Sequence, residues 1–176
     1  MTAMPATHCL TLPGPMLRRG FWLYVWRVED AKGDEWLYVG RTGDNSSPHA
    51  SAPYTRMGQH LGTMKNQNAL RKHLTARHVD LERCAFHLIA HGPIHAEVER
   101  PDCATERKTR RDELFKVHRP FRNEVGAYER DLALALKSAG YRVLNSVSWK
   151  HQGDAARWIE IQQAFAEHFP KLADAP

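Results

Sequence analysis

Residues 21–28 (FWLYVWRV) and 36–40 (WLYVG) are two short runs in which aromatic and β-branched residues dominate. Such side chains suit the pleated surface of a β-sheet. Between the two runs lies a mostly polar segment, residues 30–35, with a glycine at position 33, which is typical of a turn. The sequence therefore predicts two strands joined as a β-hairpin.

The rest of the chain contains one further strand pattern and several helix patterns. Residues 83–90 place apolar side chains at every second position from Cys84 to Leu88, and Gly92–Pro93 is expected to end this strand. Apolar residues recur with helical spacing in four segments: 54–61, 68–78, 125–139 and 154–169. Pro120 is expected to interrupt any helix in the basic stretch before residue 125. The predicted fold is α+β, a small three-stranded and mainly antiparallel sheet flanked by helices, with a C-terminal amphipathic helix.

The length of 176 residues fits a single domain with a short extension. We expect residues 1–18 to form a flexible tail, residues 19–150 the domain, and residues 151–176 a helical extension packed on that domain. Three widely spaced cysteines make a poor disulfide framework and fit a reducing compartment. The sequence has no apolar run of about 20 residues and no signal-like start, so it predicts a cytoplasmic protein without a membrane partner.

Two tyrosines, Tyr24 and Tyr38, belong to the two predicted strands of the hairpin. Paired strands can project both side chains from one face, where their hydroxyl groups can orient a water molecule or accept its proton. Strands also favour tyrosine for packing alone. The pair is therefore a candidate for catalysis that needs further support.

Arg56 and His60 stand four residues apart on the first predicted helix. This spacing places both side chains on one helix face. A guanidinium group suits a phosphate, and an imidazole suits proton transfer or a phosphate contact. A solvated helix face is the alternative interpretation, and it is the commoner one for an isolated pair.

Two polar residues interrupt apolar surroundings in the C-terminal half, Glu129 and Asn145. Glu129 lies within the apolar stripe of its predicted helix, four residues after Val125 and three before Leu132. A carboxylate that is buried without a partner is costly. A divalent metal ion and a salt bridge with an arginine would each meet the need, and the sequence does not separate them. Asn145 follows two apolar residues, where an amide fixes a turn or orients a neighbouring group.

These residues, taken in order, resemble the signature of the GIY-YIG nuclease superfamily over roughly residues 21–147. The matching pieces are Trp22-Leu23-Tyr24, Tyr38-Val39-Gly40 with Thr42, Arg56-x-x-x-His60, Ala127-Tyr128-Glu129, and Gly140 to Asn145. The two tyrosines are separated by 14 positions (38 − 24), which is close to the family's spacing. No single piece is specific, but the pieces taken together in the right order favour the resemblance.

The resemblance implies a metal-dependent endonuclease that hydrolyses a DNA phosphodiester bond. The implied catalytic residues are Tyr24, Tyr38, Arg56, His60, Glu129 and Asn145. Glu129 would hold one Mg²⁺ or Mn²⁺ ion, a tyrosine would activate the attacking water, and Arg56 would place positive charge on the phosphate. His60 would carry a proton or contact the phosphate, and Asn145 would orient a tyrosine or the backbone.

The excess of basic over acidic residues supports a nucleic-acid partner. The formal charge is +5, and basic residues are concentrated between positions 107 and 122. The expected partner is DNA, duplex or branched, or RNA. The residues expected to contact it are Arg41, Thr42, Arg107, Lys108, Arg110, Arg111 and Arg119. Phosphate contacts of this kind fix the position of the substrate without reading its sequence.

Several alternatives stay open from the sequence. Residues 114–123 also resemble the end of a GIY-YIG domain, and Glu113 with Asn123 is the fallback for the preferred pair. A chain with this fold that is catalytically inactive would be a nucleic-acid-binding module. An amphipathic tail with Trp158 would suit an interaction protein.

A zinc site is the remaining alternative, because cysteine and histidine are concentrated in one segment. Its candidate ligands are Cys84, His87, His91 and His95. On a strand, Cys84 and His87 would point to opposite faces. Their spacing therefore makes this alternative the weakest of the set.

Overall fold

The computed structural model describes residues 6–44, 46–64 and 68–173, and all structural statements concern these residues. The strands are β1 (Gly20–Glu29), β2 (Glu35–Arg41) and β3 (Ala85–Ala96). The α-helices are α1 (Pro53–Leu61), α2 (Ala69–Thr75), α3 (Ala104–Thr109), α4 (Arg111–Ser138) and α5 (Ala155–Ala166). Three short 3₁₀ helices are η1 (Gly14–Leu17), η2 (Leu81–Arg83) and η3 (Pro170–Leu172).

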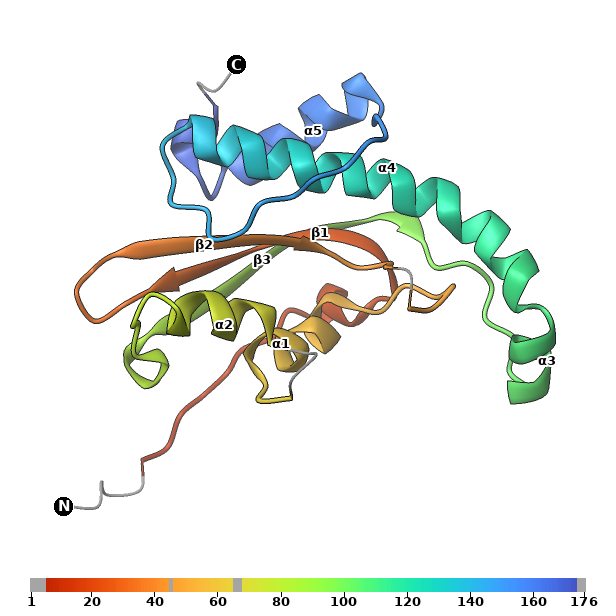
Figure 1. Ribbon diagram of the computed structural model, residues 1–176, viewed down its shortest axis with the longest axis horizontal. Coiled ribbons are helices and arrows are strands. Elements are labelled where there is room, and N and C mark those ends of the chain that lie inside the picture. Colours follow the sequence, from red (N-terminus) through yellow and green to blue (C-terminus); the bar gives the residue numbers. More distant parts are fainter. Residues whose placement is uncertain (1–5, 45, 65–67, 174–176) are drawn as a thin grey trace.

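The three strands form one antiparallel sheet in the order β2-β1-β3, so the predicted α+β fold is confirmed. Helices cover both faces: α4 and α5 lie on one side, and α1 and α2 lie on the other (Figure 1). The central strand β1 is buried along most of its length. Burial on both faces explains why residues 21–28, apart from Arg27, are apolar instead of alternating with polar residues.

The side-chain alternation of β1 divides the core into two halves. Leu23 and Val25 pack toward α4 and α5, together with Leu132 and Phe165. Tyr24, Trp26 and Val28 point to the other face and pack with α2 through Leu70 and Leu74. Helix α5 therefore belongs to the same core as α4, in the segment predicted as a helical extension.

The predicted end of the third strand was wrong. β3 continues through Gly92–Pro93 to Ala96, with a register shift opposite Phe21 and Leu23. Because β3 is an edge strand, a proline there does not remove a ladder hydrogen bond that the sheet needs. Gly92 has a φ of +143°, and a β-carbon on it would press on the Trp22 ring, so glycine fits the irregularity.

The predicted helix break at Pro120 was also wrong. Helix α4 begins at Arg111 and continues through Pro120. Leu114 and Phe115 are buried on the N-terminal side of the proline, so packing stabilises the turns that proline weakens. Both Lys116 and Pro120 are exposed, and water can therefore reach the carbonyl that proline leaves without its helical partner.

The two ends of the chain need a separate description. Residues 1–5 of the predicted tail and residues 174–176 of the predicted extension lie outside the described residues. Within the tail, η1 buries Met16. Of the helices in the described ranges, none is long and apolar enough to cross a membrane.

Candidate active site

Tyr24 and Tyr38 project from the same face of the sheet, the face covered by α1 and α2. Tyr24 is paired with Gly40 across the two strands, and Tyr38 is paired with Trp26, so the tyrosines are diagonal neighbours. A β-carbon on Gly40 would overlap the ring of Tyr24. Glycine at this position therefore lets the Tyr24 phenol lie across β2, close to the edge of the sheet.

Helix α1 brings His60 against both tyrosines. Pro53 stands at the start of this helix, where its fixed φ and missing N–H are well tolerated. The Nε2 atom of His60 lies 2.7 Å from the hydroxyl oxygen of Tyr24, and the His60 and Tyr38 ring centroids are 5.0 Å apart. The Nδ1 atom of His60 is buried and has no hydrogen-bond partner among the described residues.

Arg56 lies one helical turn before His60, and its guanidinium group is held by two acceptors. It donates from Nη2 to Oδ2 of Asp44 at 2.9 Å and from Nη1 to Oε1 of Gln59 at 2.8 Å. A cavity of about 330 Å³ opens here, and the residues that line it are Asp44, Ser46, Arg56, Gln59, His60, Asn68 and Ala69. Its size and the Arg56 guanidinium group suit a phosphate-containing ligand.

Glu129 approaches the same end of β2 from α4, on the opposite face of the sheet. Its Oε2 accepts a hydrogen bond from Nε of Arg41 at 2.8 Å, and the two side chains are only 16 % and 10 % exposed. Within the described residues, Oε1 of Glu129 accepts no hydrogen bond. The arginine salt bridge is therefore present, and one carboxylate oxygen remains available.

Trp149, in the segment after α4, fixes the position of Arg41. The Arg41 and Arg122 guanidinium groups lie over the Trp149 ring, at 4.7 and 4.6 Å from its centroid. The indole N–H donates to the backbone oxygen of Asn123 at 2.8 Å. A β-carbon on Gly126 would overlap the indole, so this glycine lets the ring contact α4 directly.

Asn145 binds the edge of β2 with its side chain. Its Oδ1 accepts from the Val39 N–H at 3.0 Å, and its Nδ2 donates to the Val39 oxygen at 2.8 Å. The amide thus continues the backbone contacts that Leu144 and Arg142 make with Leu37. Asn145 holds the backbone between Tyr38 and Gly40, and it does not contact a tyrosine hydroxyl.

Burial favours the neutral forms of Tyr24, Tyr38 and His60, and it acts against ionisation of Glu129. Burial, followed by the charge of Glu129, raises the pKa of Tyr38 to about 12, and burial raises the pKa of Tyr24 as well. Burial and the positive charge of Arg56 lower the pKa of His60 to about 4. Burial raises the pKa of Glu129, although Arg41 opposes the effect.

Asp44 is the one strongly acidic group near the cavity. Burial acts against its ionisation, but hydrogen bonds from Ser46 and Arg56 lower the pKa of Asp44 to about 2. Asp44 therefore stays ionised and neutralises part of the Arg56 charge. The backbone oxygen of Asp44 also binds His118 on α4, so the loop joins both halves of the site.

A single divalent ion of the hard type fits the donors at Glu129. Mg²⁺ and Mn²⁺ accept one or two protein carboxylates and keep several waters, and Glu129 offers one carboxylate oxygen that accepts no hydrogen bond among the described residues. Zinc would need three or four protein ligands. No group of three or more His, Cys, Asp or Glu side chains that could hold a metal is found within the ranges that the structure describes.

Two of the candidate zinc ligands, His95 on β3 and Cys84 just before it, have partners elsewhere. His95 binds Glu124 at 2.9 Å and stacks on Phe121, and the Cys84 thiol donates to the Asp80 oxygen. The fallback carboxylate Glu113 is an exposed partner of Arg110 at 3.2 Å. Glu129, in contrast, lies among the other predicted site residues.

The residues predicted to contact nucleic acid divide into three groups. Thr42 is buried, where it donates to the Gly20 oxygen and accepts from the Trp22 N–H, which is a structural role. Arg41 and Arg110 are engaged with carboxylates. Arg111 and Arg119 on α4, and Arg107 and Lys108 on α3, are in no ion pair among the described residues.

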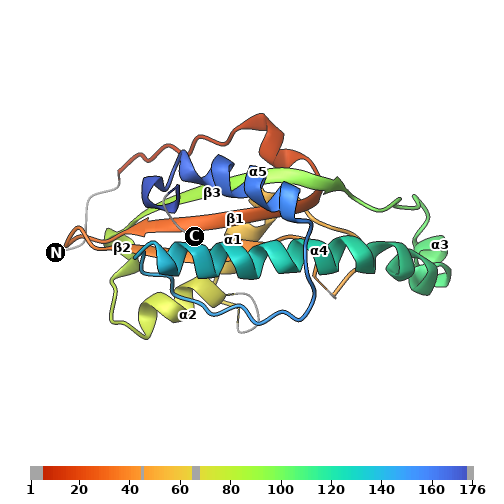
Figure 2. The same ribbon diagram turned by 90° about the horizontal axis from the view of Figure 1, so that it is seen from above.

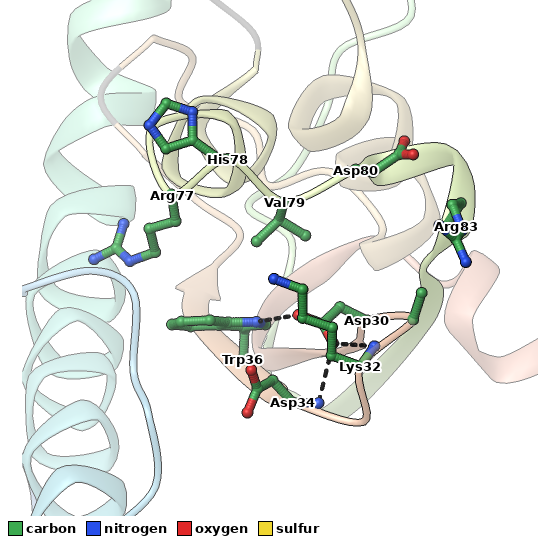
Figure 3. A pocket seen from close by; sticks show the side chains of 10 residues that line it. Asp30, Lys32, Asp34, Trp36, Arg77, His78, Val79, Asp80 and Arg83 are labelled. Carbon is green, nitrogen blue, oxygen red and sulfur yellow. Dashed lines mark hydrogen bonds between the residues drawn. The ribbon is translucent and has the colours of Figure 1, made fainter.

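A second hollow of about 210 Å³ lies at the turn between β1 and β2 (Figure 3). Trp36 forms one wall, and its indole N–H donates to Asp30 at 3.3 Å. Arg77 lies over the same ring, at 5.9 Å from its centroid. None of the residues that line this hollow belongs to the predicted site.

The structure adds three residues that the sequence did not single out: Asp44, Gly126 and Trp149. Each acts through a partner far along the chain, so no local spacing marks them. The chain matches no known family model, no curated protein and no solved structure. The arrangement of the site itself is therefore the basis for a functional proposal.

Proposed function

We propose that this protein is a metal-dependent endonuclease of the GIY-YIG type, which hydrolyses a phosphodiester bond in DNA. One observation carries the proposal: Tyr24, Tyr38, Arg56, His60 and Glu129 gather around one end of β2. They come from two strands and two helices on opposite faces of the sheet. Packing alone does not require a phenol, a guanidinium, an imidazole and a carboxylate to meet there.

The substrate phosphate would enter the cavity beside Arg56. The guanidinium group there places positive charge on the phosphate as negative charge builds up in the transition state. A divalent ion bound at Glu129 would polarise the phosphate and stabilise the leaving oxygen. Glu129 must be ionised for this purpose, so its raised pKa makes metal binding weaken as the pH falls.

We assign the proton of the attacking water to Tyr24. Its hydroxyl contacts His60, whose lowered pKa keeps the imidazole neutral and able to accept a hydrogen bond at Nε2. The phenol itself is neutral in the free protein, because burial raises its pKa. Tyr24 therefore orients the water by hydrogen bonding and loses its own proton only when a cation is close by.

A second candidate function follows from the Arg41–Glu129 ion pair. If this pair is only structural, the chain is a nucleic-acid-binding module that does not cut. Such a module would keep Arg56 and the basic face of α4 and would have no use for a metal. The same assay separates the two functions.

The test is nicking of supercoiled plasmid by the full chain with Mg²⁺, with Mn²⁺ and with chelator. The variants are Glu129→Gln and, as the matched control, Glu113→Gln, which removes an exposed carboxylate from the same helix. We expect metal-dependent nicking by the wild type and by Glu113→Gln, and none by Glu129→Gln. Loss of nicking in Glu113→Gln alone would assign the metal ion to Glu113. A wild type that binds DNA without nicking it would favour the second function.

A further inference from the structure

Helix α4 carries a row of arginines on the same side as Glu129. At about 100° per residue, Arg111, Arg122 and Glu129 lie within roughly 20° of one another around the helix axis, and Arg119 lies beside them. We call Arg111, Arg119 and Arg122 the arginine face of α4. The N-terminal half of α4 extends past the strands toward α3, so this part of the helix is open to a partner (Figure 2).

Aromatic rings hold these guanidinium groups in place. Arg111 and Arg119 lie over Phe115, at 5.0 and 5.9 Å from the ring centroid, and Arg122 lies over Trp149. None of the three arginines forms an ion pair with a carboxylate in the described ranges. The neighbouring Arg110 differs, because it binds three glutamates. The arginine face is thus an ordered cationic surface whose charge is not neutralised.

Arg122 shows the need for an anion most clearly. Its Nε atom is buried and has no hydrogen-bond partner among the described residues. Burial, followed by the positive charges of Arg41 and Arg119, lowers the pKa of Arg122, although Asp44 opposes the effect. A buried donor without a partner, close to two like charges, is unfavourable unless a negative group binds there.

The arginine face leads into the candidate site. Arg122 shares the Trp149 ring with Arg41, and Arg41 binds Glu129. From Arg111 to Glu129 is a distance of roughly 27 Å along the helix, at 1.5 Å per residue. At 3.4 Å per base pair, this length follows on the order of eight base pairs of duplex.

We propose that the arginine face of α4 binds the phosphate backbone of double-stranded DNA and aligns it with the site at Glu129. This inference rests on the proposed function for its substrate class. The aromatic rings favour a duplex over a single strand, because Phe115 is buried and Trp149 is covered by two guanidinium groups. Proteins that bind single strands instead leave aromatic faces open for base stacking.

The test is duplex binding by the full chain in chelator, measured by fluorescence anisotropy across a range of salt concentrations. The probe is a labelled 20-base-pair duplex of about 68 Å, with a single strand of the same length as comparison. The variant Arg111→Gln/Arg119→Gln removes two contacts. The variant Lys32→Gln/Lys171→Gln removes the same charge from two exposed lysines outside α4.

The arginine variant is expected to reduce the slope of log K against log salt by about 2, at roughly 0.9 per phosphate contact. Raising the salt from about 50 to 200 mM weakens duplex binding by both proteins. The factor by which affinity falls is expected to be roughly tenfold smaller for the arginine variant than for the wild type. The lysine variant is expected to keep the wild-type slope. Equal slopes for the two variants, a preference for the single strand, or no duplex binding by the wild type would each overturn the proposal.

This readout is separate from cleavage, because chelator is present throughout. If the wild type binds duplex through the arginine face and never nicks DNA, the binding surface holds and the nuclease proposal fails. If the wild type nicks DNA and the arginine variant has the wild-type slope of log K against log salt, the binding-surface proposal fails and the nuclease proposal holds.

Discussion

Two tryptophans of this protein, Trp149 and Trp36, each lie under two arginine guanidinium groups. Arg41 and Arg122 lie over Trp149 at 4.7 and 4.6 Å, and Arg77 and Arg142 lie over Trp36 at 5.9 and 5.3 Å. In each cluster one arginine also binds a carboxylate. The distance from Nε of Arg41 to Oε2 of Glu129 is 2.8 Å, and that from Nη1 of Arg142 to Oδ1 of Asp34 is 2.7 Å.

Exposure separates the two clusters. The side chains of Arg41 and Glu129 are 10 % and 16 % exposed, whereas those of Arg142 and Asp34 are 56 % and 40 % exposed. Water screens the exposed pair, so it contributes little to stability. At Glu129 desolvation is severe enough to raise the pKa despite the nearby arginine. The comparison teaches that partner type and distance alone do not separate the candidate carboxylate Glu129 from a surface ion pair, whereas burial does.

The largest expected difference between the clusters is in catalysis. Glu129→Gln is expected to reduce metal-dependent nicking roughly 1,000-fold, about 4 kcal/mol in activation free energy, because the proposed metal ion would lose its protein ligand. Asp34→Asn, a change of the same kind in the exposed cluster, is expected to nick within about twofold of the wild type. Rates are compared on one plasmid at saturating Mg²⁺. Equal rates for Glu129→Gln and Asp34→Asn would remove the functional distinction between the clusters.

The unfolding free energy is also expected to depend on pH through the buried His60. The pKa of His60 is about 4 in the folded protein against an ordinary value of 6.5. Its contribution to stability is therefore complete above pH 6.5 and is lost as the pH falls toward 4, roughly 3 kcal/mol in all. His60→Gln is expected to lose this part of the pH dependence, measured by denaturant unfolding at several pH values.

The matched control for this prediction is His87→Gln, which changes a histidine whose side chain is 45 % exposed on β3. Its unfolding free energy is expected to follow the wild-type curve between pH 6.5 and 4. A His60→Gln curve parallel to that of the wild type would mean that His60 is not kept neutral by burial.

Periodicity made most of the site predictable. Strand alternation places Tyr24 and Tyr38 on one face, and helical spacing does the same for Arg56 and His60. Glu129 was a candidate because it interrupts an apolar stripe, although the sequence did not distinguish a metal from an arginine. The structure contains the arginine partner, and the metal remains a prediction.

The residues that were not predictable depend on contacts between distant segments. Trp149 is a functional candidate only because folding brings it to Arg41, more than 100 positions away (149 − 41 = 108). The errors at Pro93 and Pro120 have a related cause. Local rules describe what proline does to an isolated strand or helix, whereas edge position and packing decide the outcome in the fold.

The contact between Trp149 and α4 is expected to tolerate no added atom at Gly126. Gly126→Ala would make a β-carbon overlap the indole, and we expect a loss of about 1–3 kcal/mol in unfolding free energy. Gly58→Ala is the control, because a β-carbon on that exposed helical glycine meets nothing within 4 Å. The control is expected to gain roughly 0.5–1 kcal/mol. If both variants gain stability in denaturant unfolding, the indole is not held against α4.

The smallest expected effect belongs to the exposed ion pair. Arg142→Gln is expected to lower the unfolding free energy by less than about 1 kcal/mol, and the difference from the wild type should shrink between about 0.05 and 0.5 M salt. Arg41→Gln is expected to cost more and to change little with salt, because its carboxylate partner is buried. Each variant removes the carboxylate-paired arginine from one tryptophan cluster, and Arg41→Gln also removes a hydrogen bond to the Gly43 oxygen. A salt-dependent loss at Arg41 as small as that at Arg142 would mean that water reaches Glu129 freely, and burial could then no longer explain why the two clusters differ.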